Sequence, residues 1–143
     1  MSSVANIIRV YQRAYVLPEH LTEFLRATMR FYDAVPTIRF AMPAQDMHVI
    51  GLEAASVSFS VVSAAEEHLA PLRDTEQTIL VADVDQALAD VLAAGGRVVQ
   101  PKTPVPPGFQ ARGQLPGGTV IEFAQWDHAE AYQDPDLSDL GIG

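Results

Sequence analysis

The sequence contains no cysteine, and this absence excludes disulfide bonds, thiolate zinc sites and cysteine nucleophiles. Basic residues are scarce, because nine Lys and Arg stand against 18 Asp and Glu, for a net charge of −9. A surface of this charge disfavours nucleic acid and anionic membranes as partners. No apolar run reaches the ~20 residues of a membrane span, and the opening stretch lacks the long apolar segment of a signal peptide. We therefore expect a cytoplasmic protein.

What is present is the composition of one globular domain. The chain has 143 residues, of which 48% are hydrophobic, and this is enough to build a core. We expect the domain to cover residues 1–126 and an acidic C-terminal tail to cover 127–143. The tail has no Lys or Arg and five acidic residues: Asp127, Glu130, Asp134, Asp136 and Asp139.

One pattern of predicted elements occurs twice along the chain. In the first half, alternation and helical spacing predict a strand over 7–16, a helix within 17–36 and strands over 37–42, 46–52 and 55–63. Residues 64–76 read as a polar connection. In the second half, the same signals predict a strand over 77–82, a helix from Asp83 to Gly95, and strands over 97–100, 109–115 and 119–126. Four prolines in 101–109 predict a stiff loop.

This repeated order predicts an α+β fold built from two βαβββ modules, about 7–63 and 76–126. A run of three strands cannot close on itself. We therefore expect the modules to share a curved mixed sheet, with a concave cleft on one face and the helices on the outer face.

Three stretches resemble the vicinal oxygen chelate superfamily, which includes glyoxalase I, extradiol dioxygenases and bleomycin-resistance proteins. They are "VDQALADVLAAGG", "PGGTVIEF" and, at the end of the first predicted helix, "RFYDAV". Together with the repeated pattern, the resemblance covers residues ~7 to 126. The acidic tail lies outside it.

The resemblance also implies where a metal site would lie. Metal-using members take ligands from four strand positions, typically two histidines, a glutamate on the last strand and one further residue. These positions fall at Tyr11, near Ser58, near Glu76 and at Glu122. Because no histidine occupies them, the set disfavours zinc, nickel and iron, and we expect no cofactor. The alternative is Mg²⁺ or Mn²⁺ held by Glu76, Glu122 and water.

The stretch "TVIEFAQW" carries one carboxylate, Glu122, in an otherwise apolar strand. A strand period of two places Ile121 and Phe123 in the core and Glu122 in the cleft. We apply the same alternation to the other predicted strands and add residues at the ends of adjoining segments. The ligand-binding residues predicted in this way are Arg9, Tyr11, Arg13, Tyr15, His48, Ser56, Ser58, Ser60, Glu76, Thr78, Phe109, Glu122 and Trp126.

The predicted lining combines small serines with aromatic walls, which suits a flat organic ligand. Arg9 or Arg13 can pair with Glu122 as a bidentate partner, or be solvated at the rim. His48 can equally be a half-buried packing residue. Phe109 can cap a ligand or belong to a plain rigid connection.

Two functions fit these residues and the resemblance. The favoured one is a metal-free, homodimeric binding protein of the bleomycin-resistance type, which sequesters or carries a bulky, aromatic ligand such as an antibiotic. The alternative is a glyoxalase-like lyase or isomerase. It would use a divalent metal at Glu76 and Glu122, or one of these glutamates as general base with Tyr11 as acid. The missing histidines favour binding over metal catalysis.

Overall fold

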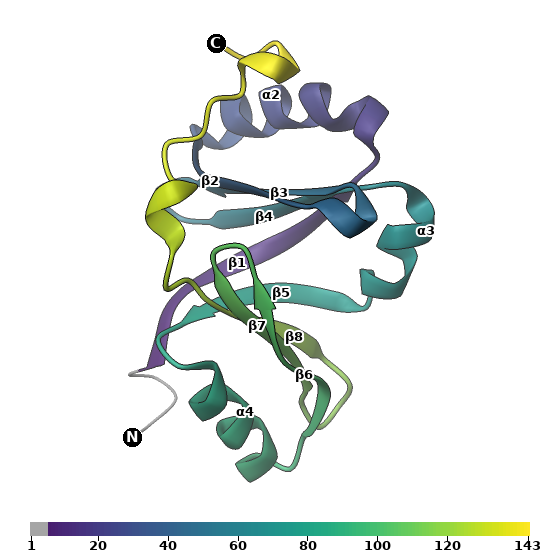
Figure 1. Ribbon diagram of the computed structural model, residues 1–143, viewed down its shortest axis with the longest axis vertical. Helices are drawn as coiled ribbons and strands as arrows, with labels where there is room; N and C mark the ends of the chain where they lie inside the picture. The colour runs from purple at the N-terminus through teal and green to yellow at the C-terminus, as the bar shows by residue number, and fades with distance from the viewer. Residues whose placement is uncertain (1–5) are drawn as a thin grey trace. The chain divides into compact units, whose positions relative to one another are not determined.

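A computed structural model describes residues 6–143 of the chain, and the first five residues of the predicted domain lie outside the described part. The chain forms two compact units. Of the described residues, the first unit comprises 6–12 and 74–129, and the second comprises 13–73 and 130–143. The strand β1 (Ile7–Val16) runs through both, with its first six residues in the first unit. Figure 1 shows the elements in order along the chain.

The first unit is a mixed sheet with one helix. Its strands follow the order β1-β5-β8-β7-β6, and β5 and β8 are parallel whereas the other neighbours are antiparallel. The bounds are β5 (Thr75–Val81), α4 (Val84–Ala93), β6 (Arg97–Val105), β7 (Gly108–Gln114) and β8 (Val120–Gln125). The helix begins as predicted at Asp83, whose side chain accepts hydrogen bonds from the backbone of Asp85 and Gln86.

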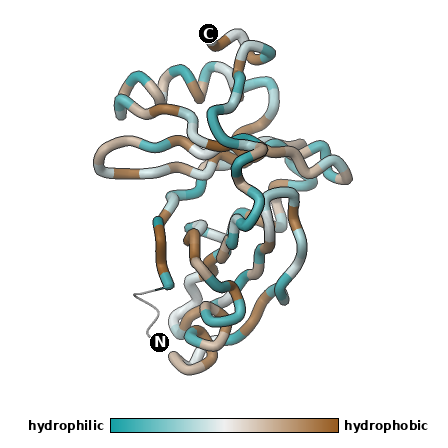
Figure 2. Tube along the Cα trace, turned by 60° about the vertical axis from the view of Figure 1, so that its left-hand side comes forward, coloured by the Kyte–Doolittle hydropathy of each residue, from teal (hydrophilic) through white to brown (hydrophobic). Residues whose placement is uncertain are grey.

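The core of the first unit lies between α4 and one face of the sheet (Figure 1). It consists of Ile79, Val81, Val84, Ala87, Val91, Ala111, Ile121 and Phe123. At the first part of β1 the apolar surface stays partly open, since Ile7 is 41% exposed and Ile8 61% exposed. Figure 2 shows the hydrophobic colour along this first part of β1.

The second unit contains an antiparallel sheet of β2, β3 and β4 with α2 across it (Figure 1). The bounds are α2 (Leu21–Tyr32), β2 (Val35–Met42), β3 (Met47–Glu53), β4 (Ser58–Ser63) and α3 (Glu66–Leu69). Short 3₁₀ turns flank them at 18–20, 43–45 and 70–72. The helix α2 is amphipathic and buries Leu21, Leu25 and Thr28. It ends where Asp33 takes a left-handed conformation and donates its N–H to Met29.

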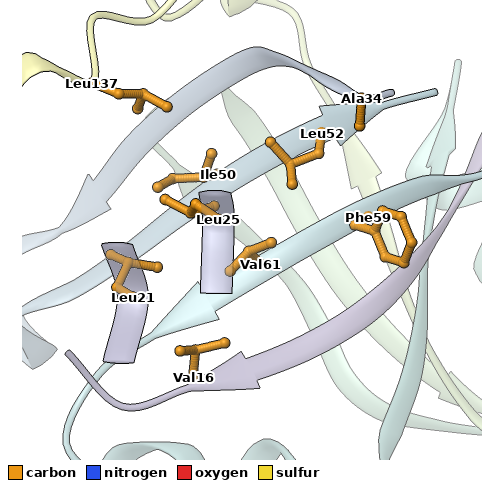
Figure 3. Packing of buried hydrophobic residues seen from close by; sticks show 9 residues of the cluster. All are labelled: Val16, Leu21, Leu25, Ala34, Ile50, Leu52, Phe59, Val61 and Leu137. Carbon is orange, nitrogen blue, oxygen red and sulfur yellow. The ribbon is translucent and has the colours of Figure 1, made fainter. Parts of the chain in front are cut away.

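The main core of the second unit gathers nine buried side chains (Figure 3). They are Val16, Leu21, Leu25, Ala34, Ile50, Leu52, Phe59, Val61 and Leu137. Val61 and Phe59 come from β4 and alternate with the serines of that strand, as the sequence predicted. Leu137 comes from the acidic tail, so the tail supplies part of this core.

The tail is also tied to the second unit by directed polar contacts. The Arg39 guanidinium donates two hydrogen bonds to the Asp139 carboxylate, at 2.7 and 2.9 Å. The Thr22 hydroxyl donates to the carbonyl of Leu140 at 2.9 Å, and Arg26 donates to the carbonyl of Gly141. An isolated bridge pairs Ile38 with Gln133. These contacts fix residues 130–143 on β2 and α2.

Asp139→Asn is expected to loosen the tail at neutral pH. The Arg39 hydrogen bonds lower the pKa of Asp139 from its ordinary value. The pKa of Asp139 is therefore lower in the folded state than in the unfolded state. The ionised carboxylate stabilises the folded tail at pH values above the unfolded-state pKa. This stabilisation is lost as the pH falls through the folded-state pKa. The hydrogen-exchange protection factors of residues 130–143, which are corrected for the intrinsic rate at each pH, should therefore fall in the variant at pH ~7, and in the wild type only on acidification below pH ~4. Asp134→Asn makes the same charge change in the same segment, and equal exchange in both variants would contradict the role of the Arg39 pair.

Three predicted boundaries are wrong. Residues 101–105, expected as a loop, belong to β6. This strand lies at the edge of the sheet, so one of its sides has no neighbouring strand and needs no N–H group to donate a hydrogen bond. Pro101 and Pro104 are therefore tolerated in it. Residues 66–72, expected as a plain connection, form α3 and a 3₁₀ turn anchored by the fully buried Leu69. The strand β4 begins at Ser58 rather than residue 55.

The predicted fold class is confirmed. Each half of the chain contributes the order strand, helix, three strands, and the architecture is α+β. The helices α2 and α4 each pack against a sheet in their own unit. Among residues 6–143, no helix is long and apolar enough to cross a membrane.

Candidate functional site

A row of polar side chains crosses the sheet of the first unit. Direct cross-strand pairing joins Tyr11 to Thr78, Thr78 to Glu122, Glu122 to Arg112, and Arg112 to Gln100. Residues paired in this way point to the same face of a sheet. We call these five residues the polar row: Tyr11, Thr78, Glu122, Arg112 and Gln100.

Glu122 is held in the row by a neighbouring hydroxyl. The buried Thr78 side chain donates a hydrogen bond to Glu122 Oε1 at 3.1 Å. Glu122 itself is half-buried. A carboxylate can accept about four hydrogen bonds. A donor on a ligand can therefore join Thr78 at Glu122.

Arg112 is fixed beside Glu122 by acceptors on three sides. Its Nε donates to Gln100 at 2.9 Å and its Nη1 to Thr75 Oγ1 at 3.3 Å, and the same nitrogen lies 3.8 Å from Asp74. Its side chain is only 17% exposed. The guanidinium is thus pre-positioned, and it places a fixed positive charge on the strand next to the carboxylate.

An aromatic pair adjoins the row. The rings of Tyr11 and Trp126 lie 5.7 Å apart between centroids and are tilted by 53°. Tyr11 is buried, whereas Trp126 is half-buried. Such a pair offers a flat apolar surface next to the Glu122 carboxylate.

The opposite face of β8 explains why this apolar strand contains a charge. Ile121 and Phe123 pack into the core under α4, as predicted from the strand period. Glu122 lies between them in sequence and therefore on the other face, where Thr78 is its hydrogen-bond donor. The structure thus brings together three of the predicted residues, Tyr11, Thr78 and Glu122, and places Trp126 against them.

Three predicted residues of the first unit lie outside the polar row. Phe109 packs with the core on the α4 side, under the ammonium of Lys102 at 4.4 Å from the ring centroid, so it faces away from the polar row. Glu76 is exposed and sits at an irregularity in β5, where the register with β8 shifts between Thr75 and Gln77. Arg9 is exposed and pairs with Leu80 two positions before Tyr11 on β1.

The predicted residues of the second unit have partners within that unit. Tyr15 donates its hydroxyl to the carbonyl of Leu72 and accepts from Arg13 Nε at 3.2 Å. The guanidinium of Arg13 lies 5.3 Å from the Tyr15 ring centroid, and that of Arg73 lies 5.7 Å from it. Arg73 in turn pairs with Glu66, and these hydrogen bonds lower the pKa of Glu66. Tyr15 therefore anchors α3 and the turn that follows it.

The remaining predicted residues lie on β3 and β4 or next to them. His48 is half-buried on β3, opposite Ala41 and Ser63, with Nε2 at 4.0 Å from Asp46.

Ser58 and Ser60 are buried on β4, opposite Glu53 and Gly51. The prediction for Ser56 as a strand residue is wrong, because the turn between β3 and β4 covers residues 54–57 and leaves Ser56 exposed.

The donor set of the polar row does not fit a metal that prefers imidazole. It offers one carboxylate, Glu122, with the neutral hydroxyl of Thr78 bonded to it and the Arg112 cation on the next strand. In the part of the chain that the structure describes, no three His, Asp or Glu side chains are grouped closely enough to hold a metal ion. We therefore derive no chemical step through a metal.

Arg112 and Gln100 were missed by the sequence reasoning. The signal for Arg112 was available, because "PGG" is a tight turn closed by the pairing of Leu115 with Thr119. Counting outward from this turn along both strands places Arg112 opposite Glu122. Gln100 carried no signal, since its pairing depends on irregularities in the register of β6.

Solved structures similar to this chain include two that match nearly their full length. A methylmalonyl-CoA epimerase from Mycobacterium tuberculosis aligns with a TM-score of 0.64 and 12% identity, covering 97% of each chain. An uncharacterized protein from Methanosarcina mazei aligns with a TM-score of 0.63 and 22% identity, covering 87% of this chain and 96% of that one. The chain has the vicinal oxygen chelate fold.

A third similar structure shows that this fold also occurs as part of a larger chain. A mutant of 4-hydroxymandelate synthase from Streptomyces coelicolor aligns with a TM-score of 0.53 and 18% identity, covering 86% of this chain and 39% of that one. No protein-family model and no curated protein sequence matches the chain. The likeness confirms the predicted resemblance in fold, and the function must be argued from the site.

Proposed function

We propose that this vicinal oxygen chelate protein binds a small organic ligand at the polar row of the first unit. The observation that supports it is the Glu122 carboxylate, held by Thr78 at 3.1 Å next to the Tyr11 and Trp126 rings. A directed charge beside a flat aromatic surface is the usual construction of a ligand site. Binding of this kind requires no metal and no covalent step.

The chemistry of the row indicates an aromatic ligand with a cationic or hydroxyl donor. Glu122 accepts from such a donor, and charge-assisted hydrogen bonds of this kind are about twice as strong as neutral ones. The aromatic part stacks on the half-buried Trp126. The net charge of −9 attracts cations at long range. Polycyclic antibiotics that carry amino groups belong to this ligand class.

Glu122→Gln is expected to weaken binding of an aromatic cation by about 10- to 100-fold, since it replaces a charge-assisted hydrogen bond by a neutral one. The probe is proflavine, a planar cation, and anthracene-9-carboxylate is a planar anion of similar area. Binding is followed by quenching of Trp126, which is the single tryptophan of the chain. We expect proflavine to bind the wild type more tightly than the anion, and this preference to disappear in the variant.

The control is Glu67→Gln, which removes one exposed carboxylate at a distance in sequence from the row. It tests whether loss of net charge alone weakens binding. Equal losses in the two variants, or unchanged affinity in Glu122→Gln, would remove Glu122 from the site. The titration is repeated with Mg²⁺ and Mn²⁺ present, and under this proposal neither cation changes the affinity.

A second candidate function is proton transfer by Glu122 as general base. Solved structures with this fold include methylmalonyl-CoA epimerases, and a half-buried carboxylate beside a fixed arginine can accept a proton next to a carbonyl. The same variant distinguishes the two functions. Incubation with methylmalonyl-CoA in D₂O should give deuterium uptake that depends on Glu122 if the protein is an enzyme of this kind, and none if it only binds.

A further inference from the structure

A cavity of ≈ 250 Å³ lies on the side of the first unit's sheet that faces α4. Its walls are mainly apolar and include Ile79, Val81, Ile121 and Phe123 from the sheet and Ala87 and Val91 from the helix. Ile121 and Phe123 flank Glu122 in β8, so the cavity and the polar row lie on opposite faces of the same strand. Ile7 also lines the cavity and is 41% exposed, which means that the cavity reaches the protein surface.

Two polar residues line this apolar cavity, and they differ in how their polar atoms are satisfied. Asn6 donates to the carbonyl of Asp83 at 2.9 Å and accepts from the N–H of Asp83 at 2.8 Å, so its amide is used by the backbone. Asp90 Oδ1 accepts from Gln86 Nε2 at 3.0 Å. Asp90 Oδ2 is buried and has no hydrogen-bond partner in the structure as described.

An acceptor of this kind is rarely left without a donor. Removing a carboxylate oxygen from water without a replacement hydrogen bond is costly, and more so for a charged group than for a neutral one. The sequence retains Asp90 on the buried side of α4, although alanine or leucine would complete the apolar wall at that position. A ligand donor inside the cavity accounts for both observations.

We propose that this cavity is a second binding site, which takes a small apolar molecule with a single ammonium group. The apolar body fills the space between α4 and the sheet, and the ammonium donates to Asp90 Oδ2. An engineered apolar cavity of about 150 Å³ binds benzene. A cavity of ≈ 250 Å³ therefore accommodates one aromatic ring with a short aminoalkyl chain. The site is separate from the polar row and does not depend on the function proposed there.

The test uses phenethylamine and propylbenzene, in which a methyl group replaces the ammonium. Binding is followed on the full-length protein by the methyl NMR signals of Ile79 and Val91, with the Trp126 indole signal as reporter of the other face. We expect saturable shifts of the cavity methyl groups, and at least ~10-fold tighter binding of phenethylamine than of propylbenzene, as one charge-assisted hydrogen bond implies. A shift of the Trp126 signal reports binding at the polar row, and it is fitted separately from the cavity signals.

Two variants make the test specific. Asp90→Asn, which keeps the volume of the side chain, should weaken phenethylamine binding at least ~10-fold while propylbenzene binds as well as before, because only the charged partner of the ammonium is lost. Ala87→Leu fills the cavity from the helix side and should abolish binding of both probes. Far-ultraviolet circular dichroism establishes that each variant is folded. If Ala87→Leu is not folded, Asp90→Asn alone decides, because it replaces the unsatisfied carboxylate oxygen without changing the volume of the side chain.

Three results would overturn the proposal. The first is an absence of saturable shifts in the wild type, and the second is equal phenethylamine affinity in wild type and Asp90→Asn. The third is a change of the Ile79 and Val91 signals with protein concentration alone, which would mean that a second copy of the chain covers the cavity. The Ile79 and Val91 signals report the cavity and the Trp126 signal reports the polar row, so failure of this proposal and failure of the polar-row proposal can be told apart.

Discussion

Gly108→Ala is expected to destabilise the first unit by about 3 kcal/mol, at the upper end of the cost of overpacking. A Cβ atom at this position would lie 2.0 Å from the carbonyl oxygen of Gln125 and 2.9 Å from the backbone nitrogen of Asp127. Both are main-chain atoms, so no side-chain rotation can relieve the contact. Urea unfolding followed by the fluorescence of Trp126 measures the loss directly, because Trp126 lies between these two residues.

Gly117→Ala is the matched control in the neighbouring hairpin. Gly117 has a positive φ of 97°, but a Cβ added there meets no atom within 4 Å. Its substitution therefore costs only backbone strain, about 1–2 kcal/mol. If the two variants were equally stable, the close approach of β7 to the end of β8 would not be the reason for glycine at position 108.

Alternation along single strands could be predicted from the sequence, and it determined much of the site. The bounds of β1 agree with the predicted strand over 7–16. In β8, the period of two correctly placed Ile121 and Phe123 in the core and Glu122 on the other face. These inferences needed only the residue pattern of one strand, because neighbouring side chains in a strand must point to opposite faces.

Inferences that depended on where a strand begins were less accurate. The serine alternation continues upstream to Ser56, but a turn closed by the Ala54 N–H and the Val57 carbonyl ends the pairing at Ser58. The alternation of serine with apolar residues is the same in this turn as in the strand, so the pattern does not show where the turn ends. Phe109 was predicted at the junction of the loop 101–109 and the strand 109–115, and alternation with Arg112 along that strand would have placed it on the core face with Ala111.

Irregular register also could not be predicted. Glu76 lies where the pairing of β5 with β8 shifts by one residue, and Gln100 joins the polar row only because β6 is irregular on both sides of it. A bulge changes which side chains share a face without changing the composition of the strand. The catalytic and metal roles inferred for Glu76 from the resemblance rested on a regular strand start, so the structure gives them no geometric support.

Leu25→Ala is expected to destabilise the second unit by about 2–5 kcal/mol. The Leu25 side chain is fully buried on α2, in the cluster that also contains Ile50 and Val61 (Figure 3). Removing it loses the burial of three carbon atoms and leaves a cavity that a helix packed on a sheet cannot fully close. Urea unfolding followed by circular dichroism gives the change in the free energy of unfolding.

Leu92→Ala makes the same substitution on α4, where the side chain is 56% exposed, and should change stability by about 0.5 kcal/mol or less.

Leu137→Ala is the more informative comparison. Leu137 is 4% exposed in the same cluster as Leu25, but it comes from the acidic tail. A loss comparable to that of Leu25→Ala would mean that the tail is part of the folded core of the second unit. A loss as small as that of Leu92→Ala would mean that the tail only rests on that core, with its attachment carried by polar contacts such as Arg39 with Asp139.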